Sequence, residues 1–132
     1  MANPRTILVV DDDAVLAQTL SLLLRAHGYE VFTAFDGVQG RELYFNHPTD
    51  VVVTDLQMPE MTGFEMMRSI RSINPGVKTI YVSGALERFE KVVKAEKRRF
   101  DVASLLKPIT MKALLDSMSA ATGKSTSASA TS

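Results

Sequence analysis

The sequence predicts a single α/β domain in which helices cover both faces of a mostly parallel, five-stranded sheet. Short apolar runs rich in β-branched residues alternate with segments whose apolar residues recur at helical spacing, and the alternation repeats five times. A length of 132 residues suits one domain with a hydrophobic core and is too short for two ordinary ones. Because right-handed crossovers leave few topologies, we expect the flavodoxin-like, three-layer arrangement with strand order 2-1-3-4-5.

The first half of the chain alternates three strand-like runs with two helical segments. The strand-like runs are short, apolar and β-branched, which favours buried strands over helices. The first helical segment has leucines three and four residues apart and stops before Gly28, and the second is closed before Pro48. Asp36-Gly37 predicts a turn. In order, the predicted elements are a strand over residues 6–10, a helix over 14–27, a strand over 29–34, a helix over 39–46 and a strand over 51–54.

The second half repeats this alternation and ends in a helix. Its first helix carries an apolar side that includes Ile73 and is broken by Asn74-Pro75-Gly76. Its second helix is charged, with a thin apolar stripe of Phe89, Val92 and Val93, and Thr110 can cap the last helix. In order, we expect a helix over residues 63–73, a strand over 77–82, a helix from 86 to about 99, a strand over 103–106 and a helix over 111–121.

The composition excludes several classes of protein. The chain has no Cys, which removes disulfides, thiolate catalysis and Cys-ligated zinc. It has neither a run of about 18 apolar residues nor a secretory signal, so we expect a cytoplasmic protein that does not span a membrane. Fifteen basic residues balance 15 acidic ones, which argues against nucleic-acid binding over the whole surface. We expect residues 1–4 to be an extension, 5–122 the domain and 123–132 a disordered Ser/Thr/Ala tail.

Four of the predicted strands end in polar residues that carry chemistry. In such a sheet, ligands bind beyond the carboxyl ends of the strands, near the point where the strand order reverses. We therefore expect carboxylates, a hydroxyl and an ammonium group to converge in one crevice. The strand-end residues are Asp11-Asp12-Asp13, Asp55, Ser83-Gly84 and Lys107-Pro108.

These strand-end groups predict phosphoryl chemistry on a carboxylate. Asp11, Asp12 and Asp55 should lie close together, and a hard divalent cation such as Mg²⁺ would relieve their mutual repulsion. With the cation in place, one carboxylate oxygen can attack phosphorus and form an aspartyl phosphate. Lys107 would supply a second positive charge, and Ser83 could donate a hydrogen bond to a phosphoryl oxygen.

Each of these residues also has an ordinary structural explanation. An Asp between a strand and a helix often caps the helix, and we expect Asp13 to do only that. Asp55 alone could begin a turn toward Pro59, and Lys107 alone could be a solvated lysine. Four positions at the ends of separate strands are harder to explain in this way, so a joint site is favoured.

Four stretches together are similar to the receiver domains of two-component response regulators, the CheY-like superfamily. The resemblance covers about residues 5–122, and the Asp-x-x-Met-Pro-x-Met-x-Gly segment that starts at Asp55 is its specific part. The acidic pair or the Lys-Pro pair alone would be weak signals. The matching stretches are Ile7-Leu8-Val9-Val10-Asp11-Asp12-Asp13, Asp55-Leu56-Gln57-Met58-Pro59-Glu60-Met61-Thr62-Gly63, Val82-Ser83-Gly84 and Leu106-Lys107-Pro108.

The resemblance implies a signalling receiver rather than an enzyme with external substrates. Asp55 would accept a phosphoryl group from a histidine kinase or a phosphotransfer protein, and Ser83 and Lys107 would contact that group. The implied Mg²⁺ ligands are Asp12 directly, Asp11 through water, Asp55, and the backbone carbonyl of Gln57. Gln57 and Ala85 occupy positions that influence hydrolysis of the phosphoaspartate, and because Ala85 cannot orient a water, we expect Gln57 to set the lifetime.

The resemblance also implies an output surface for a downstream protein target. Phosphorylation would move Ser83 and reshape the surface formed by the fourth helix, the fifth strand and the fifth helix, residues 86–99, 103–106 and 111–121. No direct nucleic-acid binding by this domain and no membrane contact are implied. The sequence leaves open whether the protein is a monomer or a phosphorylation-dependent dimer, and whether it stands alone or forms part of a longer DNA-binding regulator or hybrid kinase.

Two features depart from the family pattern. Receivers usually carry an aromatic residue three positions before the lysine, where this chain has Ser104, and Phe100 is a candidate substitute. Residues 87–99 contain six basic side chains against three acidic ones, a net charge of +3. We favour a solvated helix face for this segment, with a docking surface for an acidic partner as the functional alternative.

Other functions on the same fold fit less well. A haloacid-dehalogenase-like phosphatase would need its nucleophile in an Asp-x-Asp pair after the first strand, together with a cap insertion. This chain has no insertion of that length. A nucleotide or flavin binder would need a Gly-rich or hydroxyl-rich phosphate loop where this chain is acidic. A receiver that binds its partner without phosphorylation stays an alternative because of Ser104.

Overall fold

The structure, a computed structural model that describes residues 4–122, confirms the predicted α/β class. Five parallel strands form one sheet in the order β2-β1-β3-β4-β5, as the crossover rule led us to expect. The strands β3 and β4 are buried along their whole length, which accounts for the apolar runs Val51-Val52-Val53 and Ile80-Tyr81-Val82 within them. The strands are β1 (Thr6–Val10), β2 (Glu30–Ala34), β3 (Val51–Asp55), β4 (Lys78–Ser83) and β5 (Val102–Leu106).

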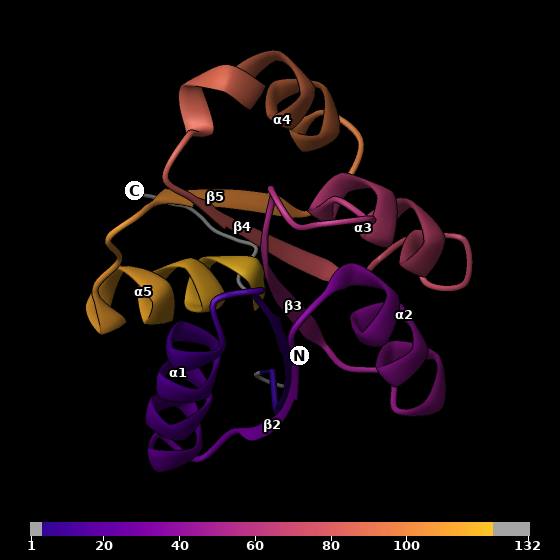
Figure 1. Ribbon diagram of the computed structural model, residues 1–132. Helices are drawn as coiled ribbons and strands as arrows, with labels where there is room; N and C mark the ends of the chain where they lie inside the picture. The colour runs from indigo at the N-terminus through magenta and orange to yellow at the C-terminus, as the bar shows by residue number, and fades with distance from the viewer. Residues whose placement is uncertain (1–3, 123–132) are drawn as a thin grey trace.

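Helices cover the sheet on both faces and make three layers. Helices α1 and α5 lie on one face, and α2, α3 and α4 lie on the other (Figure 1). A short 3-10 helix, η1 (Leu86–Phe89), leads into α4. The α-helices are α1 (Ala14–Ala26), α2 (Gly37–Asn46), α3 (Gly63–Arg71), α4 (Glu90–Lys97) and α5 (Met111–Thr122).

The hydrophobic core has two parts, one on each face of the sheet. Successive side chains of a strand point to opposite faces, so Leu8 and Val10 join the cluster under α2, α3 and α4. Ile7 and Val9 join the cluster under α1 and α5. All four are almost completely buried. The sheet is therefore fixed from both sides, and its strand ends form a rigid edge.

Several predicted boundaries and burial patterns were wrong. Asp36 caps α2 by accepting a hydrogen bond from the backbone N–H of Gln39, so Gly37 begins the helix instead of forming a separate turn. The helix predicted from residue 86 is a 3-10 turn followed by a shorter α-helix. Ile73 and Val92 are 57% and 44% exposed, because α3 ends at Arg71 and α4 buries only Val93.

The helix caps expected from the sequence are present. The side chain of Asp13 accepts a hydrogen bond from the N–H of Leu16, and Thr110 accepts one from Ala113. No helix within residues 4–122 is long and apolar enough to cross a membrane. The predicted tail over residues 123–132 and most of the predicted extension lie outside the described residues.

Candidate functional site

Three carboxylates gather at the carboxyl ends of β1 and β3. The two strands are neighbours, with Val10 opposite Thr54, so the residues that follow them come together at one edge of the sheet. One oxygen from each of Asp11, Asp12 and Asp55 lies within 4.8 Å of the others. Asp11 and Asp55 are buried, and Asp12 is exposed. The predicted acidic cluster is therefore present, with one open side toward solvent.

The ammonium group of Lys107 bridges two of these carboxylates. Its Nζ lies 3.0 Å from Oδ2 of Asp11 and 3.2 Å from Oδ2 of Asp55. Partial burial by itself would lower the pKa of Lys107, but the hydrogen bond and charge of Asp11, with those of Asp55, outweigh it and raise the pKa above its usual value. Lys107 is therefore held as a cation, inside the site and not in bulk solvent.

Backbone amides fix the orientation of the buried carboxylates. Oδ1 of Asp11 accepts a hydrogen bond of 2.9 Å from the N–H of Asp13, and Oδ1 of Asp55 accepts one of 3.3 Å from the N–H of Gln57. Each carboxylate thus has one oxygen held by the backbone and the other by Lys107. Asp13 itself uses its side chain to cap α1 and takes no part in the carboxylate cluster, as predicted.

Gly63 is a requirement of the site that the sequence analysis quoted but did not explain. A Cβ at this position would overlap the backbone carbonyl oxygen of Asp55. The N–H of Gly63 donates to the carbonyl of Leu56 at 3.0 Å, and Gly63 is the first residue of α3, whose capping box is formed by Thr62 and Glu65. The glycine that closes the Asp-x-x-Met-Pro-x-Met-x-Gly segment was the signal for this close approach.

Ser83 lies at the end of β4, the strand next to β3. It follows Val82, which is the register partner of Asp55. Its side chain is buried, and its Oγ accepts a hydrogen bond of 3.0 Å from the N–H of Ala85. Its carbonyl accepts one of 2.9 Å from the N–H of Lys107, which ties the end of β4 to the lysine of the site. Among the described residues, its hydroxyl donates to no acceptor, so its proton is available to a ligand.

The donor set of the cluster fits a hard divalent cation. All three side chains offer carboxylate oxygens, which Mg²⁺ and Ca²⁺ prefer, and none offers nitrogen or sulfur. The exposed side at Asp12 leaves room for water ligands, which favours Mg²⁺. The cluster could therefore hold a divalent metal ion, and the individual ligand roles, including that of the Gln57 carbonyl, stay predictions.

Phe100 does not replace the missing aromatic residue at position 104. Its ring lies against the guanidinium of Arg71, 4.4 Å from Cζ to the ring centroid, between α3 and α4. The hollow beside Ser104, about 350 Å³ in volume, is lined by other residues. The aromatic residue opposite Ser104 in the sheet register is instead the buried Tyr81 of β4.

Comparison with known proteins gives one consistent family. The profile of the family described as the response regulator receiver domain matches residues 7–119. The response regulator MprA of Mycobacterium sp. (strain KMS) is 34% identical over 117 residues, which are 89% of this chain and 50% of MprA. The probable transcriptional regulatory protein TcrX of Mycobacterium tuberculosis is 39% identical over 81 residues, 61% of this chain and 35% of TcrX. This chain thus spans half or less of the length of these relatives.

Solved structures give the same result. A response regulator receiver domain protein from Clostridium thermocellum aligns with a TM-score of 0.79 and 30% identity, over 89% of this chain and 93% of that one. The CheX-CheY-BeF3-Mg complex from Borrelia burgdorferi contains a chain that aligns with a TM-score of 0.81 and 25% identity, over 92% of both. The acidic edge of the sheet is therefore carried by a fold found in both proteins.

Proposed function

This chain belongs to the response regulator receiver domain family of two-component signalling, and on that premise we propose that Asp55 accepts a phosphoryl group from a histidine kinase or a phosphotransfer protein. One observation carries the proposal: Lys107 Nζ bridges the buried carboxylates of Asp55 and Asp11 next to a third carboxylate. A reactive carboxylate, a fixed cation and a metal-type oxygen cluster are the groups that phosphoryl transfer to an aspartate requires.

The transfer follows from the placement of the side chains. An oxygen of Asp55 attacks the phosphorus, the bond from phosphorus to the donor's imidazole nitrogen breaks, and that nitrogen regains a proton. Lys107 stabilises the negative charge on the phosphoryl oxygens, and the free hydroxyl proton of Ser83 can be donated to one of them. The product is an acyl phosphate on Asp55 that adds charge of about −1.5 to −2 to the site.

We propose Mg²⁺ as the metal of this site. Asp12, Asp55 and the carbonyl of Gln57 would hold it directly, and Asp11 would act through water. When bound, it offsets the negative charge of the carboxylates and of the phosphoryl oxygens. Two of the cluster's carboxylates already contact Lys107, so the exposed Asp12 is the carboxylate most available to a cation.

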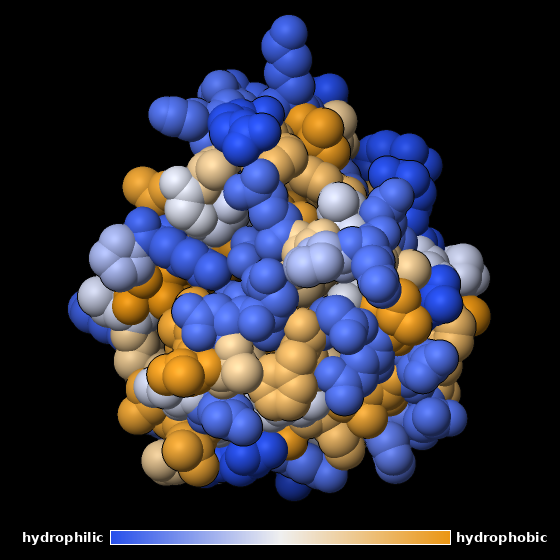
Figure 2. All heavy atoms as spheres, viewed as in Figure 1, coloured by the Kyte–Doolittle hydropathy of each residue, from blue (hydrophilic) through white to orange (hydrophobic). Residues whose placement is uncertain are grey.

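The apolar surface of α1 supports docking of the phosphoryl donor. Val15, Leu22 and Leu23 are 74%, 64% and 42% exposed, and orange patches gather over α1 and α5 in Figure 2. A hollow of about 400 Å³ joins this surface to Lys107. Exposed apolar patches of this kind typically mark protein interaction sites. Leu22→Glu should therefore slow phosphorylation by the cognate kinase and leave phosphorylation by acetyl phosphate unchanged.

For the output we propose a downstream protein target that contacts α4, β5 and α5. The phosphoryl group would draw Ser83 toward Asp55 and shift the population of two arrangements of the loop that precedes η1. Ser104 replaces the aromatic residue that usually accompanies this movement. A receiver that binds its partner without phosphorylation is therefore the second candidate function, favoured by the hollow beside Ser104.

The main experiment is incubation of the full chain with Mg²⁺ and acetyl phosphate, followed by intact-mass spectrometry. We expect one acid-labile phosphoryl group per chain on the wild type and none on Asp55→Asn or Asp55→Ala. No incorporation into the wild type would favour the second candidate. Release of phosphate from a small phosphate ester over many turnovers, faster than the phosphorylated chain loses its own phosphoryl group, would contradict the proposal that the domain is a phosphoacceptor rather than an enzyme with external substrates.

The lifetime of the phosphoryl group gives a further test. A water that approaches Asp55 passes Gln57 and Ala85, and Ala85 has no side-chain group that can orient it. We expect Gln57→Ala to change the rate of dephosphorylation, measured as loss of the phosphorylated mass over time. An unchanged rate would overturn this role of Gln57.

The wider context of the domain is also a proposal. TcrX is named as a transcriptional regulator and is longer than this chain, so a DNA-binding regulator or a hybrid kinase that contains this domain stays an alternative to a separate receiver. We propose a cytoplasmic location, where a histidine kinase would present its phosphoryl group, and phosphorylation-dependent dimerisation as one form of output. Genomic neighbours of the full reading frame would identify the kinase, and light scattering with and without acetyl phosphate would test the dimer.

A further inference from the structure

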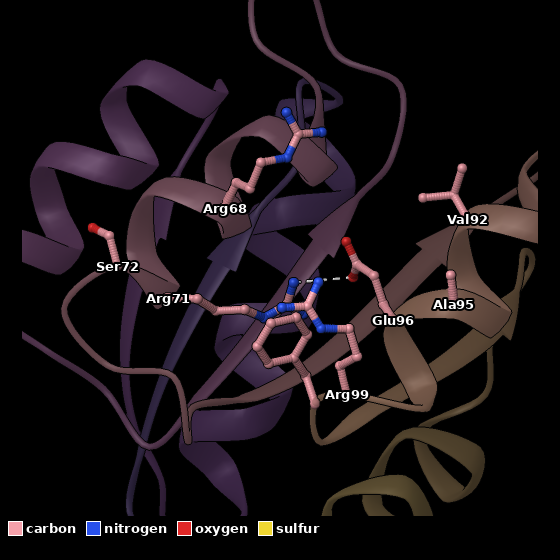
Figure 3. Close-up of a pocket in the computed structure, with 8 residues that line it drawn as sticks. Arg68, Arg71, Ser72, Val92, Ala95, Glu96 and Arg99 are labelled. Atoms are coloured by element: carbon pink, nitrogen blue, oxygen red, sulfur yellow. Dashed lines mark ion pairs between the residues drawn. The ribbon is translucent and has the colours of Figure 1, made fainter.

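A groove between α3 and α4 is separate from the phosphoryl site. Its volume is about 440 Å³, and it shares no lining residue with the hollow beside Ser104. Figure 3 shows the side chains that line the groove. None of the residues of the candidate site lines it, neither Asp11, Asp12 and Asp55 nor Ser83 and Lys107. The residues that line the groove are Arg68, Arg71, Ser72, Val92, Ala95, Glu96, Arg99 and Phe100.

The charge of the groove is positive and only partly compensated. Its single carboxylate, Glu96, accepts a hydrogen bond of 2.6 Å from Tyr81 and pairs with Nη1 of Arg71 at 3.0 Å, both through Oε1. The negative charge of Glu96 is therefore compensated by Arg71 and is not available to the other arginines of the groove. The exposed guanidinium groups of Arg68 and Arg99 pair with no carboxylate among the described residues, so both are available to an anionic ligand.

The inner wall combines apolar surface with guanidinium groups. The ring of Phe100 contacts Arg71 and Arg99, whose Cζ atoms lie 4.4 and 5.3 Å from the ring centroid. On the α4 side, Val92 is 44% exposed. In Figure 3, Arg71, Glu96 and Arg99 lie together, and Arg68 on α3 stands apart from them. Cationic groups on α3 and in the segment that follows α4 thus flank an apolar strip.

The outer surface of α4 extends this positive charge. Residues 87–99 carry six basic and three acidic side chains, and two of the acidic ones are neutralised locally. Glu90 pairs with Lys94 at 3.0 Å, and Glu96 pairs with Arg71. Hydrophilic side chains gather over α4 at the top of Figure 2. The unpaired cations of this segment therefore face solvent, where they can attract an acidic partner.

We propose that the groove between α3 and α4 binds an acidic segment of a partner protein. Carboxylates of that segment pair with Arg68 and Arg99, and an apolar side chain between them packs on Val92 and Ala95 of α4. Bidentate pairing suits guanidinium groups, and the apolar strip adds contact area that a purely electrostatic encounter lacks.

A nucleic acid fits this groove less well. Binding of single strands relies on bases that stack on open aromatic faces. Phe100, the aromatic ring of the groove, is already in contact with two guanidinium groups. The groove is formed in the unphosphorylated protein, so the binding does not require phosphorylation of Asp55.

The experiment selects peptides of about 12 residues from a phage-displayed library on the immobilised full chain. Enriched peptides are synthesised, and their Kd is measured by fluorescence anisotropy against the wild type, Arg68→Glu, Arg99→Glu and the matched control Arg98→Glu. Arg98 is an exposed neighbour that does not line the groove. Thermal melts check that all variants fold, and a single-stranded DNA oligonucleotide is titrated in parallel.

We expect enriched peptides to contain acidic and apolar residues. Their Kd should rise about tenfold or more in Arg68→Glu and Arg99→Glu and less than about threefold in Arg98→Glu, and affinity should fall with added salt. Three results would overturn the proposal: no enrichment, peptides whose affinity is the same for all four proteins, or DNA binding that needs Arg68 and Arg99 while peptide binding does not.

Discussion

Helices α3 and α4 cover the same face of the sheet but are held there by different forces. Helix α3 buries six of its nine residues, among them Phe64, Met67 and Ile70, and begins with a capping box. Helix α4 buries one of its eight residues, Val93, and its first turn has no side-chain cap. The main additional anchor of α4 is polar: Glu96 accepts from Tyr81 and pairs with Arg71 of α3.

This difference bears on signalling. A buried Met or Phe side chain contributes about 1.5–3 kcal/mol, so α3, which carries four large buried apolar side chains, is fixed to the sheet. Helix α4 depends on one valine and a small polar cluster, and regions with few buried apolar contacts open most easily. The output surface that we propose includes α4, so the more weakly held of the two helices belongs to the surface that phosphorylation is expected to reshape.

We expect the largest loss of stability from a substitution in the buried face of α3. Met67→Ala should lower the free energy of unfolding by about 2–5 kcal/mol, because it leaves a cavity in a completely buried position. The control Val92→Ala on α4 should change it by less than about 0.5 kcal/mol, since Val92 is half-exposed. Urea denaturation followed by circular dichroism measures both, and equal effects would remove the contrast between the helices.

The polar anchor of α4 should give the next largest effect. Glu96→Gln leaves the buried guanidinium of Arg71 without its carboxylate, and we expect a loss of about 2–3 kcal/mol. Glu90→Gln, the matched control, breaks an exposed pair with Lys94 and should cost less than about 0.5 kcal/mol. Hydrogen exchange should speed up in α4 and stay slow in α3, and protection of α4 unchanged by Glu96→Gln would contradict an anchoring role.

The hydrogen bond from Tyr81 should have a smaller effect. Tyr81→Phe keeps the ring in the core and removes only the hydroxyl that donates to Glu96 at 2.6 Å. A hydrogen bond to a charged group contributes about 1.5–3 kcal/mol, and we expect the lower end because Arg71 still pairs with Glu96. Thr79→Val provides a comparison, because it removes the hydroxyl oxygen that accepts a hydrogen bond of 3.0 Å from Nη2 of Arg71. A loss for Tyr81→Phe near zero would show that the hydroxyl does not stabilise α4.

The pH dependence of stability provides a second test of the role of Tyr81. Burial, and then the hydrogen bond to Glu96, raise the pKa of Tyr81 well above its ordinary value of 10.0. The folded protein therefore keeps a proton that the unfolded chain releases. This contribution to stability is complete below pH 10 and is lost as the pH rises above it.

The raised pKa values of Tyr44 and Lys107 act in the same direction. We therefore expect Tyr81→Phe to flatten the fall in stability above pH 10 without abolishing it. Melting curves of the wild type and the variant between pH 8 and about 11 measure the difference. Curves that stay parallel over this interval would show that Tyr81 is not the group responsible.

Much of the fold and the site was predictable because the signals are local. Short apolar runs and helical patterns identified the five strands and the five α-helices, and the rules for parallel sheets predicted that Asp11, Asp55 and Lys107 meet at one edge. The carboxylate cluster and its bridging lysine were confirmed. The start of α2 at Gly37 was missed, since Asp-Gly is typical of turns and also of a helix cap.

The surroundings of α4 were not predictable from the same signals. An apolar stripe indicates that a helix has a buried side, but not how far it is covered, so Val92 was expected to be buried and is exposed. Phe100 was considered for the position of the missing aromatic residue and instead contacts Arg71. Neither arrangement follows from spacing, because each depends on residues of other elements.

The sequence by itself determined the class of the fold, the strand order and the set of groups at the carboxyl edge of the sheet. These depend on periodicity and on which residues follow each strand, both of which are properties of short segments. Tertiary structure alone decided that Glu96 joins Tyr81 and Arg71, that Gly63 lies against the carbonyl of Asp55, and that a cationic groove separates α3 from α4. Such contacts join side chains distant in sequence, and they form only when packing has set the distances between elements.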